Sequence, residues 1–297
     1  MDWILVAVAA YFLNAVTPLI DKFLLGDHIP NPTVYAFYVG LLSIVAVIMA
    51  PFGLIWPGTA QFLFSLVSGA LFLFGLYVFF IALKRQEASR VVPVVGAFVP
   101  LVVSVLAYLW LGDRLDRYEM IAFVLLVSGG VLMSVERETR RLSPRGVLVP
   151  LAAAFLMGAS YVLLKGLFGY QPFISSFVWT RVGTFLAALS LLIPSVSRRA
   201  IIHSTKALRV KTTGLFIFNK ALGGVTYLLL NFAFFLGSVT LVNAMQGVQY
   251  LFLFLFTVIL SRFFPKVLKE ELTTSVVVQK LAAILIITAG LGVLSYH

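Results

Sequence analysis

Residues 88–134 read ASRVVPVVGAFVPLVVSVLAYLWLGDRLDRYEMIAFVLLVSGGVLMS, and their pattern indicates the architecture of the protein. It contains two apolar runs, 91–111 and 118–135, separated by a short polar turn. Each run approaches the roughly 20 residues that a helix needs to cross a bilayer. The runs are continuous and do not alternate in polarity every second residue, so they indicate transmembrane helices and not the strands of a barrel.

The same pattern extends over all 297 residues, of which 61% are hydrophobic and 11% charged. Soluble domains have roughly 45–50% apolar and about 25% charged residues, and the mean hydropathy is +1.06. We therefore predict an all-α membrane protein with ten spans in two sets of five, without a separate soluble domain. The expected spans are 3–24, 33–55, 61–83, 91–111 and 118–135, followed by 147–168, 172–194, 214–236, 239–261 and 275–295.

Basic residues are distributed unevenly between the loops. Loops after the third, fifth, seventh and ninth spans hold fifteen Lys and Arg, whereas those after the fourth, sixth and eighth hold two. Because cytoplasmic loops carry the excess of Lys and Arg, this count predicts an inner or plasma membrane protein with both termini outside the cell. The same distribution accounts for the formal net charge of +11, so we expect no nucleic-acid partner. The segment 198–211 is either a solvated loop or an interfacial helix attracted to anionic lipid.

Several classes of protein are disfavoured by what the sequence lacks. There is no cysteine, and the three histidines, His28, His203 and His297, lie far apart, so neither thiolate chemistry nor a metal enzyme is expected. The first residues lack the positive region of a signal peptide, and we expect the first apolar stretch to be retained as a helix.

The two sets of five spans resemble each other. The segment GGVLMS at 129–134 resembles GLGVLS at 290–295, and at an offset of 143 residues Lys22 falls on Lys165. A repeat with an odd number of spans must be inverted relative to its copy, which predicts a pseudo-two-fold axis in the membrane plane and a substrate site at the midplane. The expected domains are a first repeat at 1–136, a basic linker at 137–146 and a second repeat at 147–297.

The stretch 88–134 resembles the fourth and fifth helices of the EamA-type repeat, which belongs to the drug/metabolite transporter superfamily. In that repeat a proline-bearing helix ends in a Gly-acid turn before a glycine-rich helix, and two five-helix repeats make up the protein. The resemblance implies a transporter without a cofactor and without catalytic residues.

Three features depart from the family. The acid after the fourth helix is Asp113 where Glu is usual, and the second repeat has a longer charged loop, 261–271, in place of the short turn. Members of the superfamily are usually described with cytoplasmic termini, whereas the loop count predicts the opposite orientation.

Arg181 is the clearest candidate for substrate binding. It lies about ten residues into its span, where a charged side chain costs roughly 2.5–3.5 kcal/mol on insertion scales. EamA-type repeats often carry a basic residue here, and Tyr38 occupies the equivalent offset in the first repeat. None of the eleven acids lies centrally in a predicted span. Arg181 is therefore satisfied by backbone carbonyls and amide side chains, or it binds an anionic part of the solute.

The ninth span carries a second polar group. Asn243, Gln246 and Tyr250 follow at spacings of three and four, which places them on one helical face, and Gln249 flanks that face. Amides suit contacts with a small metabolite, and they suit hydrogen bonds between helices equally well. Both interpretations remain open at this point.

Five further residues are weaker candidates. Lys220 either reaches substrate or extends toward the basic side of the membrane, and Asn14 lies near the middle of the first span. Lys22 and Lys165 sit at matched positions near the outer ends of their spans, where interfacial anchoring is favoured over gating. Asp21 adjoins Lys22, so a gating salt bridge is conceivable there.

A central arginine with amides, and no embedded carboxylate, disfavours export of cationic drugs. It favours a secondary transporter that moves a small polar metabolite, such as an amino acid, a sugar or a nucleotide-related solute, by alternating access. The alternatives are a membrane-embedded enzyme acting on lipid, or a lipid scramblase. The expected partners are the solute and the bilayer, with a monomer slightly preferred.

Overall fold

The computed structural model describes residues 2–25, 31–85, 88–134, 144–205, 210–263 and 274–296. All regular elements within these ranges are helices. Eight segments are long and apolar enough to cross a membrane, and α1 is a shorter apolar helix. A helix satisfies its own backbone donors and acceptors, which lipid cannot do. The predicted helical membrane fold is confirmed, and the helices are compatible with the ten-span layout.

The first half of the chain forms six α-helices and two irregular helical segments. They are α1 Asp2–Asn14, α2 Thr17–Phe23, α3 Pro32–Leu42, the 3-10 segment η2 Ser43–Phe52, α4 Thr59–Arg85, α5 Ala88–Leu106, the π segment η3 Ala107–Leu111 and α6 Arg117–Ser134.

The second half of the chain forms seven α-helices. They are α7 Pro144–Leu167, α8 Phe173–Ser190, α9 Ser195–Thr205, α10 Val210–Leu236, α11 Val239–Ala244, α12 Gln246–Phe263 and α13 Thr274–Ser295.

Two of the predicted spans are divided, and others change helix type. The span at 3–24 is divided into α1 and α2, because Pro18 has no N–H to continue the hydrogen bonding of α1. The span at 239–261 is divided at Met245 into α11 and α12, which corrects the expectation of one continuous helix there. The span at 33–55 changes from α-helix to 3-10 helix at Ser43. Interrupted helices within a membrane protein are tolerated where other protein groups satisfy the freed backbone.

Glycine allows the closest approaches between helices. A Cβ at Gly130 of α6 would lie 3.0 Å from the Cα of Gly247 in α12. Gly129 of α6 faces Ile287 of α13, and Gly290 of α13 faces Leu126 of α6. Gly129 and Gly290, which align when the two halves of the sequence are compared, therefore lie in the same interface, between α6 and α13.

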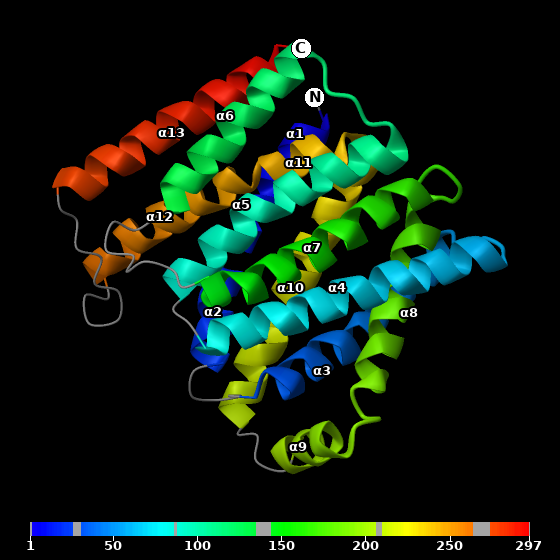
Figure 1. Ribbon diagram of the computed structural model, residues 1–297. Coiled ribbons are helices and arrows are strands. Elements are labelled where there is room, and N and C mark those ends of the chain that lie inside the picture. The colour runs from blue at the N-terminus through cyan, green and yellow to red at the C-terminus, as the bar shows by residue number, and fades with distance from the viewer. Residues whose placement is uncertain are drawn as a thin grey trace.

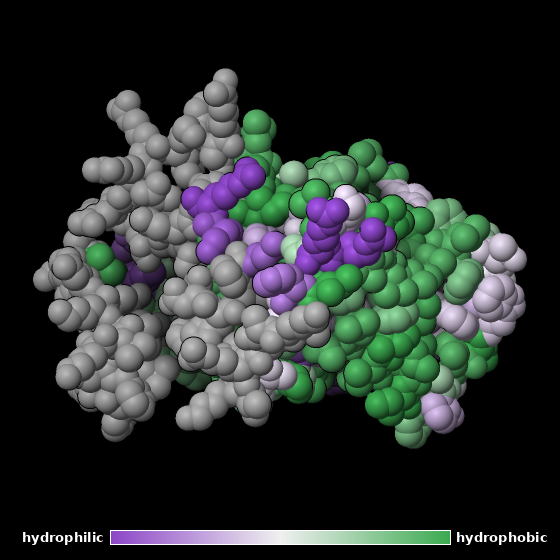
Figure 2. All heavy atoms as spheres, turned by 90° about the horizontal axis from the view of Figure 1, so that it is seen from below, coloured by the Kyte–Doolittle hydropathy of each residue, from purple (hydrophilic) through white to green (hydrophobic). Residues whose placement is uncertain are grey.

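The helices are packed side by side, and the two chain termini lie at the same end of the bundle (Figure 1). The ends of α4, α6 and α12 lie at the opposite end, as do the starts of α5, α7 and α13 (Figure 1). These six helix ends adjoin predicted basic loops in the sequence, and they lie away from the termini (Figure 1). Figure 2, viewed from below, shows hydrophilic side chains gathered beside a part of the face that is largely apolar. Arg198, Arg199 and His203 of α9 are exposed.

Candidate functional site

Arg181 occupies the middle of α8 and lies among aromatic rings. Its guanidinium carbon is 3.8 Å from the ring centre of Tyr227, 4.8 Å from that of Phe72 and 5.9 Å from that of Phe177. We call Phe72, Phe177 and Tyr227 the aromatic box. A cation over such rings is attracted by their electron-rich faces. The box brings together α4, α8 and α10 around one charge.

The guanidinium is buried without a counter-ion among the described residues. Arg181 is 8% exposed, and its Nε and Nη2 atoms have no hydrogen-bond partner in that part of the chain. The hydroxyl of Tyr227 is likewise buried and unpartnered there. Each unsatisfied buried polar group costs about 1–3 kcal/mol. The amide and carbonyl partners that the sequence offered as an alternative for Arg181 are not found among the described residues.

Asp21 and Lys220 form an ion pair on the side of α10 that faces α2. Lys220 Nζ lies 2.6 Å from Asp21 Oδ1. The same oxygen accepts hydrogen bonds of 2.5 Å from Tyr35 OH and from Asn219 Nδ2. We call these four residues the Asp21 cluster. It joins α2, α3 and α10 through one carboxylate oxygen.

The structure pairs Asp21 and Lys220, which the sequence did not connect. Asp21 pairs with Lys220, a residue 199 positions away, and the side chain of its neighbour Lys22 lies outside the described residues. Lys220 neither extends to the interface alone nor stands free for substrate in this conformation. Tyr38 lies nearby, with its ring centre 6.2 Å from that of Phe216, whose own ring lies 5.7 Å from Lys220 Nζ.

Gly223 lies between the Asp21 cluster and the aromatic box along α10, one turn from both Lys220 and Tyr227. It is half-buried, and a Cβ built on it would meet no atom within 4 Å. Asn219 and Thr226, one turn away on either side, are buried at 0% and 2% exposure. Gly223 therefore borders space that side chains leave unfilled.

Polar residues of the ninth span form hydrogen bonds to backbone groups within the protein. Asn243 donates its amide to the carbonyl of Val239, one turn back in α11, at 2.8 Å. Tyr250 of α12 donates its hydroxyl to the carbonyl of Val92 at 3.3 Å. A Cβ on Gly96 would collide with that hydroxyl, so glycine at 96 is what lets Tyr250 reach the backbone of α5. Gln246 is half-buried.

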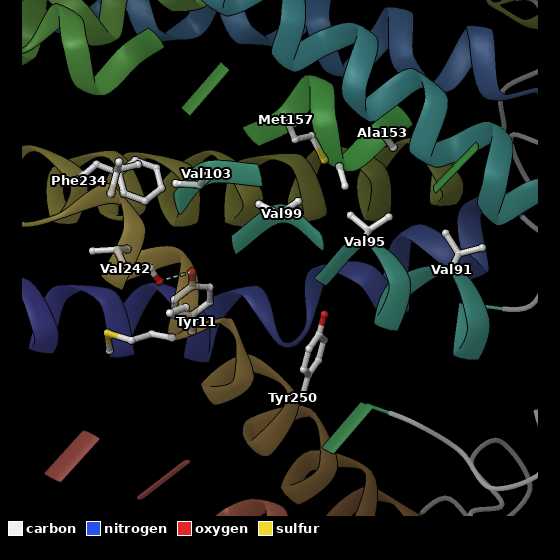
Figure 3. Packing of buried hydrophobic residues seen from close by; sticks show 14 of the residues in the cluster. Tyr11, Val91, Val95, Val99, Val103, Ala153, Met157, Phe234, Val242 and Tyr250 are labelled. Carbon is white, nitrogen blue, oxygen red and sulfur yellow. Dashed lines mark hydrogen bonds between the residues drawn. The ribbon is translucent and has the colours of Figure 1, made fainter. Parts of the chain in front are cut away.

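Tyr11 and Gln249 bind carbonyls beside the two helix interruptions. Tyr11 OH donates to the carbonyl of Val242 at 2.8 Å, next to the break between α11 and α12 (Figure 3). Gln249 Nε2 donates to the carbonyl of Asn14 at 3.1 Å, next to the break between α1 and α2. Asn14 Nδ2 returns a hydrogen bond of 3.0 Å to Gln249 Oε1. Asn14 and Gln249 are thus occupied by each other.

Lys165 and Asp113 hold the connection between α10 and α11. Lys165 Nζ donates to the carbonyls of Phe234 and Gly237 at 2.7 and 2.8 Å, where α10 ends. Asp113 Oδ2 accepts from Ser238 and Thr240 at 2.9 and 3.0 Å, where α11 begins. A cation near a helix C-terminus and an anion near an N-terminus both complement the helix dipole. Lys165 is bound to backbone in this conformation.

The first half of the chain is similar in sequence to a known family of membrane proteins. Residues 1–135 match the model of the EamA-like transporter family. The match covers 135 of the 297 residues and confirms the resemblance seen in the sequence. With the apolar helices, it indicates a multi-pass membrane transporter of the drug/metabolite transporter superfamily. No curated protein matches the chain in sequence.

A solved crystal structure of a protein shares the fold of this chain over its whole length. The similarity has a TM-score of 0.71 at 16% sequence identity, and it covers 100% of this chain and 96% of the other. At that identity the similarity shows the fold alone.

Several residues of the transporter's interior were not found from the sequence. Tyr35, Phe72, Phe177 and Tyr227 are aromatic residues in apolar helices, and nothing in their spacing distinguishes them from ordinary core residues. Asp113 was noted as the acid of a turn, but its contact with Ser238 joins positions 125 residues apart. Only the packing of separate helices reveals these contacts.

Proposed function

We propose that this EamA-type protein is a secondary transporter of a small polar metabolite, and that Arg181 binds an anionic part of the solute. The observation that carries the proposal is the buried guanidinium with unpartnered Nε and Nη2 atoms. A charge at this depth is costly unless it has a function or a partner. An anionic or zwitterionic solute, such as an amino acid or a nucleotide-related metabolite, supplies the partner; a sugar carrying an acidic group also fits.

Alternating access is the mechanism we propose. The open space beside Gly223 supports a solute path along α10 between the aromatic box and the Asp21 cluster. The Asp21–Lys220 pair then acts as a gate, since breaking it separates α2 from α10. Arg181 is 8% exposed, so the solute site is closed in this conformation and opens in another.

The proposed setting is the plasma membrane of the cell, with the basic helix ends toward the cytoplasm. Transport, and not lipid chemistry, is the role that family membership supports. The acids of the turn before α6 support this as well, because Asp116 and Glu119 cap that helix: Asp116 Oδ1 accepts from the N–H of Glu119 at 2.8 Å, and Glu119 Oε2 accepts from the N–H of Asp116 at 2.9 Å.

Uptake into liposomes tests the proposal. The purified protein is reconstituted, and the accumulation of radiolabelled amino acids, sugars and nucleotides is measured for the wild type and for Arg181→Ala. We expect saturable uptake of at least one anionic or zwitterionic solute, and a loss of more than tenfold in the variant. Arg198→Ala on the exposed face of α9 is the matched control and should retain uptake. Equal uptake by wild type and a folded Arg181→Ala variant would contradict the assignment.

A further inference from the structure

The hydrogen-bonding groups of Arg181 lie at the edges of its guanidinium. The central carbon of this group lies over the rings of Tyr227 and Phe72, 3.8 and 4.8 Å from their centres. The N–H bonds of a guanidinium lie in its plane and point outward from its edges. A ligand that hydrogen-bonds to Arg181 therefore meets it at an edge.

The two unpartnered nitrogens share one edge. Nε and Nη2 point their N–H bonds in nearly the same direction, which is the side-on fork that matches the two oxygens of a carboxylate. Both atoms are buried and have no partner among the described residues. Tyr227 adds a third group, because its buried hydroxyl is unpartnered in the same part of the chain.

The charge of the site favours one negative charge over two. Lys220 is engaged with Asp21 at 2.6 Å, and it lies two helical turns from Tyr227, about 10 Å along the axis of α10. Arg181 is then the single cation in contact with the box residues among those described. A carboxylate balances one guanidinium, whereas a phosphate monoester brings more charge and further oxygens that need donors.

We propose that the Nε–Nη2 edge of Arg181 binds the carboxylate of a solute whose adjoining part is apolar and packs against the aromatic box, with Tyr227 donating a hydrogen bond to the same carboxylate. This inference rests on the proposed function and narrows its solute class from anionic or zwitterionic metabolites to carboxylates. It also adds Tyr227, which the sequence did not single out, as a residue that determines specificity.

Calorimetric binding to the purified, full-length protein in nanodiscs tests the inference with benzoate as the probe. Benzamide has the same shape without the charge, and phenyl phosphate presents the alternative oxyanion. We expect saturable binding of benzoate, with benzamide and phenyl phosphate each at least tenfold weaker. Arg181→Lys keeps the charge and loses the two-donor edge, so it should weaken benzoate binding by tenfold or more. Arg198→Lys on α9 should leave it unchanged.

Tyr227→Phe provides a second measurement should Arg181→Lys fail to fold. It retains the ring over the guanidinium and removes the hydroxyl, and we expect about tenfold weaker benzoate binding with unchanged benzamide binding. The inference is overturned by the absence of benzoate binding to the wild type, by equal binding of benzamide, by a preference for phenyl phosphate, or by full benzoate affinity in folded Arg181→Lys or Tyr227→Phe.

Different results would contradict the proposed transport function and the proposed carboxylate site. Binding of benzoate with the expected preferences, but without uptake of any solute into liposomes, retains the carboxylate site and rejects transport through it. Uptake that depends on Arg181 but favours solutes without a carboxylate retains the transporter and rejects the carboxylate site.

Discussion

The side chain of Gln249 binds the backbone carbonyl that Pro18 leaves without a partner. In a continuous helix the carbonyl of Asn14 would accept a hydrogen bond from the N–H of residue 18, and proline has none. Gln249 Nε2 donates to that carbonyl at 3.1 Å, and Gln249 Oε1 accepts from Asn14 Nδ2 at 3.0 Å. The glutamine of α12 thus stabilises the interruption between α1 and α2.

Replacing Gln249 tests this relationship. Gln249→Leu retains the approximate size of the side chain and removes both hydrogen bonds to Asn14, whose carbonyl keeps only the long contact of 3.4 Å from Thr17 Oγ1. We therefore expect a loss of about 1–3 kcal/mol in the free energy of unfolding. The measurement is thermal or denaturant unfolding in detergent. Gln246→Leu is the matched control, because Gln246 lies on the same helix and is half-buried; it should change stability by less than about 0.5 kcal/mol. Equal effects of the two substitutions would show that the hydrogen bond contributes nothing.

The Asp21–Lys220 pair should show strong coupling between its members. Lys220→Met leaves the largely buried carboxylate of Asp21 without its cation, and we expect it to destabilise the protein by about 2–4 kcal/mol. This loss is below the maximum for buried pairs because the Lys220 and Asp21 side chains are 12% and 15% exposed. In Asp21→Asn with Lys220→Met, neither charge remains. The double variant should therefore lose less stability than the sum of the single variants, as measured by a double-mutant cycle. Simple additivity would argue against an energetic link.

Filling the open space beside Gly223 should block transport without unfolding the protein. Gly223→Leu places a side chain on the buried face of α10, where a Cβ meets no atom within 4 Å. We expect uptake to fall by more than tenfold while the melting temperature is maintained or rises, since leucine favours helix more than glycine does. Gly224→Leu is the control. It adds the same side chain at an exposed neighbouring position that also has no atom within 4 Å. Retained uptake in Gly223→Leu would exclude this path.

The orientation of the protein can be measured with single cysteines, because the chain contains none. Tyr296 is 96% exposed near the C-terminus, and Arg198 is exposed on α9. In intact cells a membrane-impermeant maleimide should label Tyr296→Cys and should label Arg198→Cys only after the membrane is permeabilised. The reverse pattern would place the termini in the cytoplasm, as is usual for the superfamily.

Composition and apolar run length were sufficient to predict the helical membrane fold. Ten segments of nearly continuous hydrophobicity leave few alternatives, because lipid offers no hydrogen bonds to an exposed backbone. The resemblance of residues 88–134 to an EamA-type repeat also came from local features, a proline-bearing helix, a Gly-acid turn and a glycine-rich helix. Arg181 could be singled out for a similar reason, since a charge in the middle of an apolar run is rare whatever surrounds it.

The partners of the polar residues depend on how the helices pack, which the sequence does not reveal. A salt bridge between Asp21 and its neighbour Lys22 was conceivable from the sequence, and the structure pairs Asp21 with Lys220, 199 positions away. Gln249 was considered for ligand contact and is bound to Asn14, 235 positions away. Hydrophobicity determines that a segment lies in the membrane, but nearly every helix here is apolar around most of its circumference. Which faces meet therefore depends on glycine contacts and on backbone groups freed at helix breaks, and these take effect only once the helices are packed.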